Sequence, residues 1–169
     1  MTFAAPEPLT AEHRLDAFES GVVSLDDWLR RRAMQNQASG AARTFVANES
    51  GRVVAYYALA SSAVALVAAP GRFRRNMPDP IPVVVLARLA VARTHQGRGL
   101  GRALFQDCAR RVIHAAETIG IRGLLVHAIS DQAKAFYLGL GLDPSSIDPM
   151  TMMTTMADLK AALTALGER

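Results

Sequence analysis

The stretch Val83-Val84-Val85-Leu86-Ala87-Arg88-Leu89-Ala90-Val91 is followed closely by Gln96-Gly97-Arg98-Gly99-Leu100-Gly101, and these two segments decide the fold. The first is almost wholly apolar, which is typical of a central strand covered on both faces. After the glycines, apolar residues recur at helical spacing to about Gly120, which predicts a long helix. A strand, a glycine-rich turn and a helix in this order predict α/β packing.

The glycine-rich turn has the properties of a pyrophosphate-binding loop. Its three glycines leave backbone N–H groups accessible, and the N-terminus of the helix that follows favours an anion. Arg98 and Arg102 add positive charge, and we expect Gln96 to brace the turn. Tight strand-to-helix turns also use glycine for steric reasons, so the turn alone leaves a purely structural interpretation open.

The rest of the chain predicts a hairpin, further strands and further helices. A polar turn at residues 48–51 separates two β-rich runs, which indicates an antiparallel pair, and Ser24 is placed to cap a helix. The predicted elements are helical turns at 12–18, a helix at 25–38, strands at 43–47, 52–60, 63–68, 124–128 and 150–156, an exposed loop at 70–82, and helices at 132–139 and 158–166.

Composition limits the class of protein. The 169 residues carry a net charge of +4 that arginine largely supplies, which favours recognition of phosphate. One cysteine, Cys108, excludes an internal disulfide, and no Cys/His spacing predicts a metal. The opening residues lack a basic segment followed by an apolar one, and no stretch reaches the ~18 apolar residues of a membrane span. We therefore expect one cytoplasmic domain over residues 1–169.

The spacing Gln96-x-x-Gly99-x-Gly101 resembles the Q/R-x-x-G-x-G/A signature of the GNAT N-acetyltransferases. It is unlike a Walker loop, because no Gly-Lys-Ser/Thr follows, and its glycines are not spaced as in a Rossmann fingerprint. Leu89-Ala90-Val91 is similar to the family's splayed strand, and Ala133-x-x-Phe136-Tyr137 to its late helix. The resemblance implies a GNAT fold: a mixed, mostly antiparallel central sheet with a splayed strand pair, flanked by helices.

The resemblance also implies acetyl-CoA as co-substrate and Tyr137 as the general acid. A phenol of pKa about 10 stays neutral near pH 7 and can protonate a departing thiolate, whose thiol has a pKa of about 8.5. The alternative for Phe136 and Tyr137 is an aromatic pair packed on the sheet. Asp131 stands where many members carry asparagine. The residues implied to bind the co-substrate are Leu89, Ala90, Val91, Gln96, Gly97, Arg98, Gly99, Leu100, Gly101, Arg102, Asp131 and Phe136.

A general base is harder to find in the sequence. The strand that ends at Val91 holds no carboxylate, and we do not expect Glu49, Asp107 or Glu117 to face the site; His127 stays open as a base. At pH 7 an α-amine of pKa about 7.7 is free in roughly a sixth of molecules, whereas a lysine amine of pKa about 10.4 is almost wholly protonated. The missing base therefore indicates an α-amino acceptor.

The whole chain resembles one GNAT branch, the toxins of toxin–antitoxin systems that acetylate the α-amine of aminoacyl-tRNA. The segments that carry this resemblance lie at 8–9, 21–29, 37–40, 43–46, 51–60 and 86–91. It implies a homodimer, tRNA binding and neutralisation by an antitoxin of the ribbon-helix-helix type. The candidate tRNA contacts, whose alternative is a solvated surface, are Arg30, Arg31, Arg32, Arg72, Arg74, Arg75, Arg93 and Lys134.

Two alternatives of other kinds stay open. A small-amine or protein N-terminal acetyltransferase would turn over a free amine or peptide without any effect of tRNA. An acetyl-CoA-binding regulatory or interaction module would bind the co-substrate without transferring its acetyl group, and the presence of Tyr137 disfavours it.

Overall fold

The computed structural model describes residues 4–167. Residues 1–3, part of the opening segment that was examined for a leader, and residues 168–169 lie outside this part. The chain divides into two compact units. The first runs up to Ala60 and includes Ala87–Cys108; the second holds Ser61–Leu86 and the chain from Ala109 onward. The chain passes between the units within β3, β4 and α4.

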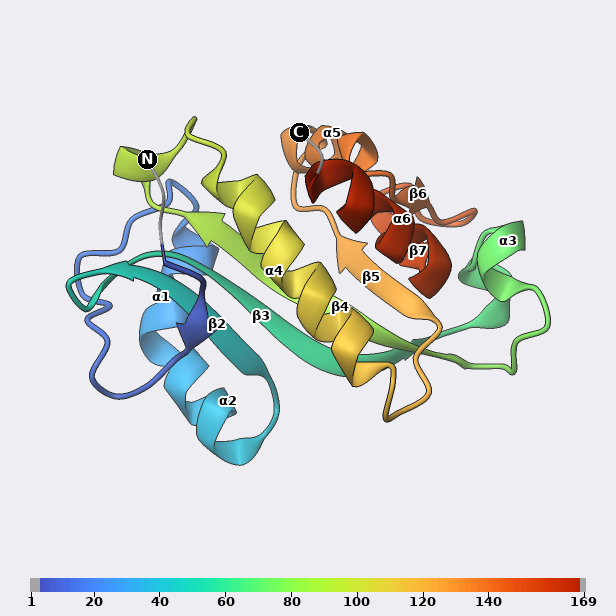
Figure 1. The fold of residues 1–169 in the computed structure, drawn as a ribbon, viewed down its shortest axis with the longest axis horizontal. Coiled ribbons are helices and arrows are strands. Elements are labelled where there is room, and N and C mark those ends of the chain that lie inside the picture. Colours follow the sequence, from blue (N-terminus) through green and yellow to red (C-terminus); the bar gives the residue numbers. More distant parts are fainter. Residues whose placement is uncertain (1–3, 168–169) are drawn as a thin grey trace. The chain divides into compact units, whose positions relative to one another are not determined.

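The strands follow the order β1-β2-β3-β4-β5-β7-β6 in one sheet (Figure 1). The β4–β5 pair is parallel, and β1–β2, β2–β3, β5–β7 and β6–β7 are antiparallel. This confirms the predicted mixed, mostly antiparallel sheet. The strands are β1 (Glu7–Pro8), β2 (Arg43–Glu49), β3 (Arg52–Val64), β4 (Ile81–Val91), β5 (Gly123–His127), β6 (Asp143–Pro144) and β7 (Thr151–Thr155).

The helices are distributed along the whole chain. They are α1 (Val23–Arg31), α2 (Ala33–Ser39), α3 (Gly71–Arg74), α4 (Leu100–Ala115), α5 (Asp131–Gly139) and α6 (Met156–Gly167). Short 3₁₀ turns at Leu66–Ala68 and Arg93–His95 join some of them to the strands.

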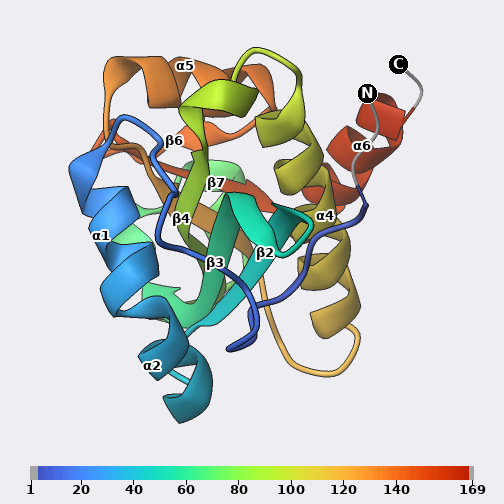
Figure 2. The ribbon, with the colours of Figure 1, turned by 90° about the vertical axis from the view of Figure 1, so that its left-hand side faces the viewer.

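The core of the first unit lies between α1, α2 and the strands β2 to β4 (Figure 2). Tyr56 is fully buried there, and its hydroxyl donates a 2.6 Å hydrogen bond to the carbonyl of Leu25. Phe18 packs edge-on against the Tyr56 ring, and Trp28 stacks on it at 6.0 Å between centroids. Burial raises the pKa of Tyr56, so this phenol stays protonated and serves as a structural donor.

The core of the second unit forms around Phe73, Ile81, Leu125 and Met153. Helix α6 lies along β5 and β7, and α3 contacts β7 (Figure 1). Arg122 donates from Nε to the carbonyl of Phe73 at 2.8 Å and lies over its ring. These contacts anchor the chain at the start of β5, the strand that leads to His127.

The predicted helix 25–38 is wrong in one respect, because it is two helices. Arg32 has φ −120° and ψ −30°, which ends α1, and its N–H bonds to the carbonyl of Trp28. Val22, not Ser24, stands at the N-cap of α1. Val22 makes no side-chain capping hydrogen bond, and Ser20, before the helix, donates from its N–H and its hydroxyl to the buried Asp26 carboxylate.

Other boundaries also differ from the predictions. Residues 12–18 form turns rather than a helix, because Arg14 exchanges backbone hydrogen bonds with Gly51 and Val53 of the hairpin. The predicted third strand at 63–68 is the end of the long strand β3 followed by a 3₁₀ turn. The loop at 70–82 contains α3, β1 and β6 were missed, and α4 ends at Ala115 rather than near Gly120.

Candidate active site

The predicted phosphate loop lies between β4 and α4, in the first unit. β4 ends at Val91, the turn at Arg93–His95 follows, and α4 begins at Leu100, as the sequence predicts. Gln96 braces the loop, because its Nε2 donates hydrogen bonds of 2.8 Å to the carbonyls of Val91 and Ser20. One amide thereby joins the end of β4, the start of the loop and the segment before α1.

Two glycines give the loop its shape. Gly97 has φ +78° and Gly99 has φ +79°, a conformation that side chains disfavour. A Cβ built on either residue meets nothing within 4 Å. The glycines are therefore required by the backbone conformation and not by crowding from the protein, and the space above them is open to a ligand. This combination fits a pyrophosphate held by backbone N–H groups.

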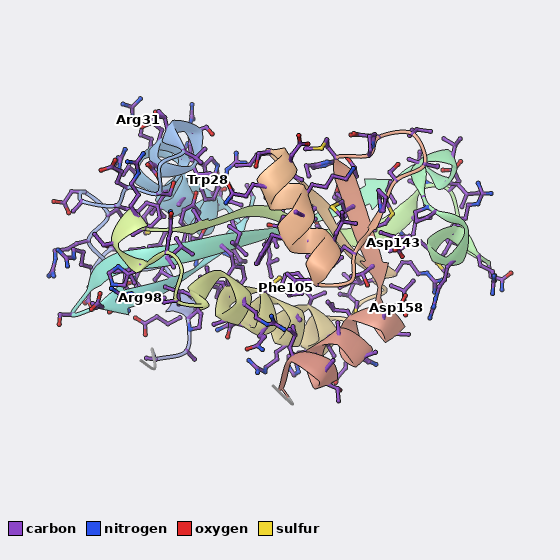
Figure 3. All side chains as sticks on the ribbon, turned by 90° about the horizontal axis from the view of Figure 1, so that it is seen from above. Trp28, Arg31, Arg98, Phe105, Asp143 and Asp158 are labelled. Carbon is purple, nitrogen blue, oxygen red and sulfur yellow. The ribbon has the colours of Figure 1, made fainter. Side chains whose placement is uncertain are left out.

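The N-terminus of α4 supplies the electrostatic part of the loop. The N–H groups of its first turn have no intrahelical acceptor, and the helix dipole places partial positive charge there. Leu100 is buried and fixes this end of the helix, whereas Arg98 is exposed on the loop (Figure 3). Arg102 is half-buried one turn into the helix. Backbone donors and two guanidinium groups are thus available to an anion.

The strand before the loop carries the residues predicted to pair with pantetheine. Ala90 is buried in the core, and Leu89 and Val91 are half-buried. The parallel ladder between β4 and β5 pairs Val84–Leu86 with Leu124–Val126, and β4 continues beyond it to Val91.

Tyr137 lies on α5, in the second unit. Ser130 caps this helix by accepting a hydrogen bond from the N–H of Ala133 at 3.1 Å, and Asp131 is its first residue. The Tyr137 side chain is 6% exposed, and its ring meets that of Phe136 edge-on at 5.1 Å. The aromatic contact that was considered as an alternative therefore exists, and it also holds the phenol in one orientation.

The three carboxylates considered as bases each have a partner. Glu49 contacts Nε2 of the buried His95, and Asp107 accepts a 2.5 Å hydrogen bond from the hydroxyl of Tyr57. Glu117 lies 3.8 Å from Nδ1 of His114. These partners support the expectation that none of the three carboxylates serves as a base.

Nucleophilic and metal chemistry find little support in the described residues. Cys108 is fully buried in α4, and burial raises the pKa of its thiol above the usual range, so it is a poor nucleophile. Within residues 4–167, no group of three or more His, Cys, Asp or Glu side chains is arranged to hold a metal ion. None of the helices in the same part is long and apolar enough to cross a membrane.

The basic residues predicted to contact tRNA divide into two groups. Three of them form ion pairs within the protein: Arg30 with Asp27, Arg72 with Asp158, and Arg93 with Glu19. The others form no ion pair with any residue between 4 and 167: Arg31, Arg32, Arg74, Arg75 and Lys134. Figure 3 shows Arg31 at the end of α1.

The sequence analysis missed several polar contacts. Arg88, half-buried on β4, lies over the Trp28 ring at 5.0 Å. His127, Thr151 and Asp148 are joined by hydrogen bonds that begin on different strands and loops. No local motif predicts the contacts of Arg88 with Trp28 or of His127 with Thr151, because these partners are far apart in sequence.

The strand, the bent glycine loop and the helix define an α/β protein with a site for a phosphate-bearing ligand. Residues 40–141 match the family model described as "Acetyltransferase (GNAT) domain". This match covers more than half of the chain, and the protein therefore belongs to the GNAT acetyltransferase family.

Individual relatives agree with this family. A tRNA-acetylating toxin of Mycobacterium tuberculosis is 48% identical over 95% of this chain and 97% of its own length. The solved structure of AtaT complexed with acetyl-methionyl-tRNAfMet has a TM-score of 0.86 at 27% identity, covering 93% of this chain and 97% of that one. A structure of AtaTR bound with acetyl-CoA has a TM-score of 0.80 at 28% identity, covering 93% and 96%.

Proposed function

We propose that this acetyltransferase is a toxin that acetylates the α-amino group of aminoacyl-tRNA with acetyl-CoA and thereby blocks translation. The observation that carries the proposal is the 48% identity, over 95% of the chain, to a tRNA-acetylating toxin. The braced glycine loop supports it, because this loop fits the pyrophosphate of the co-substrate. Both units together form the acetyltransferase domain in this proposal.

In this proposal the co-substrate is bound both by backbone groups and by charged side chains. The N–H groups from Gly97 to Arg102 bind the pyrophosphate, and the guanidinium groups of Arg98 and Arg102 add charge-assisted hydrogen bonds. The backbone of Leu89–Val91 pairs with pantetheine. Asp131 and Phe136, on the helix of Tyr137, are the further residues that we propose to bind the co-substrate.

In the transfer step, the amine nitrogen attacks the thioester carbonyl and the carbon–sulfur bond breaks. A C–N bond replaces the C–S bond, the nitrogen loses one proton, and the sulfur leaves as a thiolate. Tyr137 donates its phenolic proton to this thiolate and regains one from solvent. Its burial and its contact with Phe136 fix the hydroxyl and limit the number of orientations from which it donates.

The tRNA is bound through its phosphates in this proposal. Its phosphates require cations that are not neutralised within the protein. In this proposal the unpaired basic residues Arg31, Arg32, Arg74, Arg75 and Lys134 make the main contacts. Arg30, Arg72 and Arg93 each already contact a carboxylate, which competes with a phosphate for the same guanidinium.

The biological setting follows from the same relatives. A structure of a tyrosine-to-phenylalanine variant of AtaT is bound to the C-terminus of the antitoxin AtaR and to acetyl-CoA; it is 26% identical, with a TM-score of 0.81. In our proposal the present chain is likewise neutralised by an antitoxin, one of the ribbon-helix-helix type. It acts as a homodimer in the cytoplasm, where aminoacyl-tRNA is found.

The test is transfer of labelled acetyl from acetyl-CoA to charged bulk tRNA, with deacylated tRNA and a peptide amine as controls. We expect label only in charged tRNA, and in a form that survives as the N-acetyl amino acid after the ester is hydrolysed. Label in the peptide instead would favour a small-amine or protein N-terminal acetyltransferase. Acetyl-CoA binding without transfer to any amine would favour a binding module.

A further inference from the structure

His127 ends β5 in a position that no local motif marks as functional. The residue before it, Val126, pairs with Leu86 in the parallel ladder between β4 and β5. His127 itself is exposed and pairs with Thr151 at the start of β7. It is therefore held by the strand backbone while its imidazole faces outward.

A chain of two hydrogen bonds begins at this imidazole. Nδ1 of His127 lies 2.8 Å from Oγ1 of Thr151, and that hydroxyl donates to Oδ2 of Asp148 at 2.7 Å. The other carboxylate oxygen, Oδ1, accepts from the N–H of Met150 at 3.0 Å. The carboxylate is thus fixed by two donors, in a loop whose backbone also closes through the N–H of Thr151 and the carbonyl of Asp148.

These two hydrogen bonds determine which nitrogen of the imidazole carries the proton. The hydrogen bond from Thr151 lowers the pKa of Asp148, so its carboxylate is ionised and can only accept. The single hydroxyl proton of Thr151 is committed to Asp148, and Oγ1 must therefore accept from Nδ1–H of His127. The neutral imidazole then has its lone pair on Nε2, which has no hydrogen-bond partner among residues 4–167.

An imidazole oriented through Nδ1 by a hydroxyl and a carboxylate is equipped to accept a proton at Nε2. The carboxylate of Asp148 stands at the far end of these hydrogen bonds, and the adjacent cross-strand pair, Val126 and Met152, carries no charge. Glu49 and Asp107, two carboxylates also considered for this role, have partners of their own.

We infer that His127 is the general base of the acetyl transfer: its Nε2 takes the proton that the attacking amine loses as the C–N bond forms. Thr151 and Asp148 are positioning residues that set the tautomer. The departing thiolate takes its proton from Tyr137, so the two protons move through different groups, and His127 releases its proton to solvent after the acetylated product forms. This inference rests on the proposed function for the identity of the amine.

The first test compares His127→Gln with the wild type in single-turnover transfer to charged tRNA. Glutamine keeps a donor toward Thr151 but has no basic nitrogen. We expect kcat to fall by about 10²- to 10⁴-fold with little change in KM or in the acetyl-CoA dissociation constant. His114→Gln is the matched control, because His114 is an exposed histidine on α4 that contacts only the neighbouring turn through Glu117. Wild-type kcat in His127→Gln would overturn the inference.

Chemical rescue provides a readout that a merely structural role would not change. In His127→Ala, added imidazole should raise the transfer rate of the variant by about ten-fold or more and should do so saturably. His127 is exposed, so the space that its side chain leaves is accessible. Thr151→Val should lower kcat, whereas Thr151→Ser, which keeps the hydroxyl, should retain it. Absence of rescue, or equal rates for the two Thr151 variants, would overturn the assignment.

These experiments separate the inference from the proposed function. Wild-type transfer to charged tRNA establishes the substrate whatever His127 does. If the wild type acetylates only a peptide amine, the proposed substrate is wrong, and the same variants and rescue are then measured with that amine. Acetyl-CoA binding and thermal unfolding of each variant confirm that it is folded before its rate is compared.

Discussion

The side-chain amide of Gln96 donates a 2.8 Å hydrogen bond to the carbonyl of Val91, the last residue of β4. The same nitrogen donates to the carbonyl of Ser20. Replacing Gln96 by leucine removes both bonds and leaves two carbonyls without this donor, so the loop should lose its fixed shape. We expect the acetyl-CoA dissociation constant, measured by calorimetry, to rise by about 10-fold or more.

Gln35→Leu is the control for this substitution. Gln35 is an exposed residue of α2, so the same change in side chain is made outside the loop. Its acetyl-CoA affinity should equal that of the wild type. If both variants bind equally well, Gln96 does not support the co-substrate loop.

Gly99 tests the loop from its backbone. Its φ of +79° is a conformation that a β-branched residue rarely adopts, and a side chain here would occupy the open space assigned to the phosphates. Gly99→Val should therefore weaken acetyl-CoA binding strongly, by about 10-fold or more. Gly120→Val is the matched control, because Gly120 is exposed, has no positive φ and also has open space around its Cβ. Equal dissociation constants for the two variants would contradict the assigned loop.

Some of this architecture follows directly from the sequence. The end of β4 and the start of α4 were predicted because an apolar run, alternating glycines and helical periodicity each have a local physical cause. The role of Gln96 as a brace was predicted for the same reason, since its position in the motif is local. One of the predictions that were wrong, the helical turns at 12–18, has a tertiary cause, because the backbone of Arg14 bonds to the β2–β3 hairpin instead.

Other parts depend on tertiary contacts that no local pattern contains. The break between α1 and α2 falls at Arg32, although the helical spacing of apolar residues continues through it. In the sequence, Asp26 has the position of an acidic residue in the first turn of a helix. In the structure it is buried and accepts hydrogen bonds from Ser20. The hydrogen-bonded chain from His127 to Asp148 joins a strand end to a loop 21 residues later, so only the fold brings its members together.

Tyr137→Phe should separate binding from chemistry. The substitution keeps the ring that packs against Phe136 and removes only the hydroxyl. Because the proposed acid acts on the leaving thiolate, we expect kcat to fall by about 10² to 10⁴ while the acetyl-CoA dissociation constant stays within about two-fold. Single-turnover transfer and calorimetry on the same sample measure both quantities. Unchanged turnover would remove Tyr137 from this role.

The hydrogen bond between Thr151 and Asp148 has a consequence for acid stability. It is the largest cause that holds the pKa of the Asp148 carboxyl below its ordinary value of 3.8. The hydrogen bond from the N–H of Met150 lowers the same pKa to a smaller extent. A depressed carboxyl pKa contributes stability that is present above the ordinary value and is lost as the pH falls through the folded-state pKa. Thr151→Val should therefore raise the pKa of Asp148 and reduce this contribution near neutral pH, but not at acid pH.

A carboxyl-detected NMR titration of Asp148 measures this shift directly, and denaturant unfolding at several pH values measures the stability. Thr164→Val is the control, because Thr164 donates only to the carbonyl of Lys160 within α6. The titration of Asp148 should be unaffected in that variant. A pKa of Asp148 that does not move in Thr151→Val would show that the hydroxyl donates elsewhere and would remove the basis for the His127 tautomer.

Gly123, the first residue of β5, tests the packing of the strand that ends at His127. A Cβ at this position would lie 1.9 Å from the carbonyl oxygen of Thr154 on β7 and 2.9 Å from the ring of Phe73. Backbone cannot move aside as a flexible side chain does, so Gly123→Ala should destabilise the protein by at least about 1–3 kcal/mol or prevent folding. Gly120→Ala, three residues earlier in open space, should change the free energy of unfolding by less than about 0.5 kcal/mol. Denaturant unfolding of both variants measures the difference, and equal midpoints would mean that β5 and β7 are not packed as closely as the structure indicates.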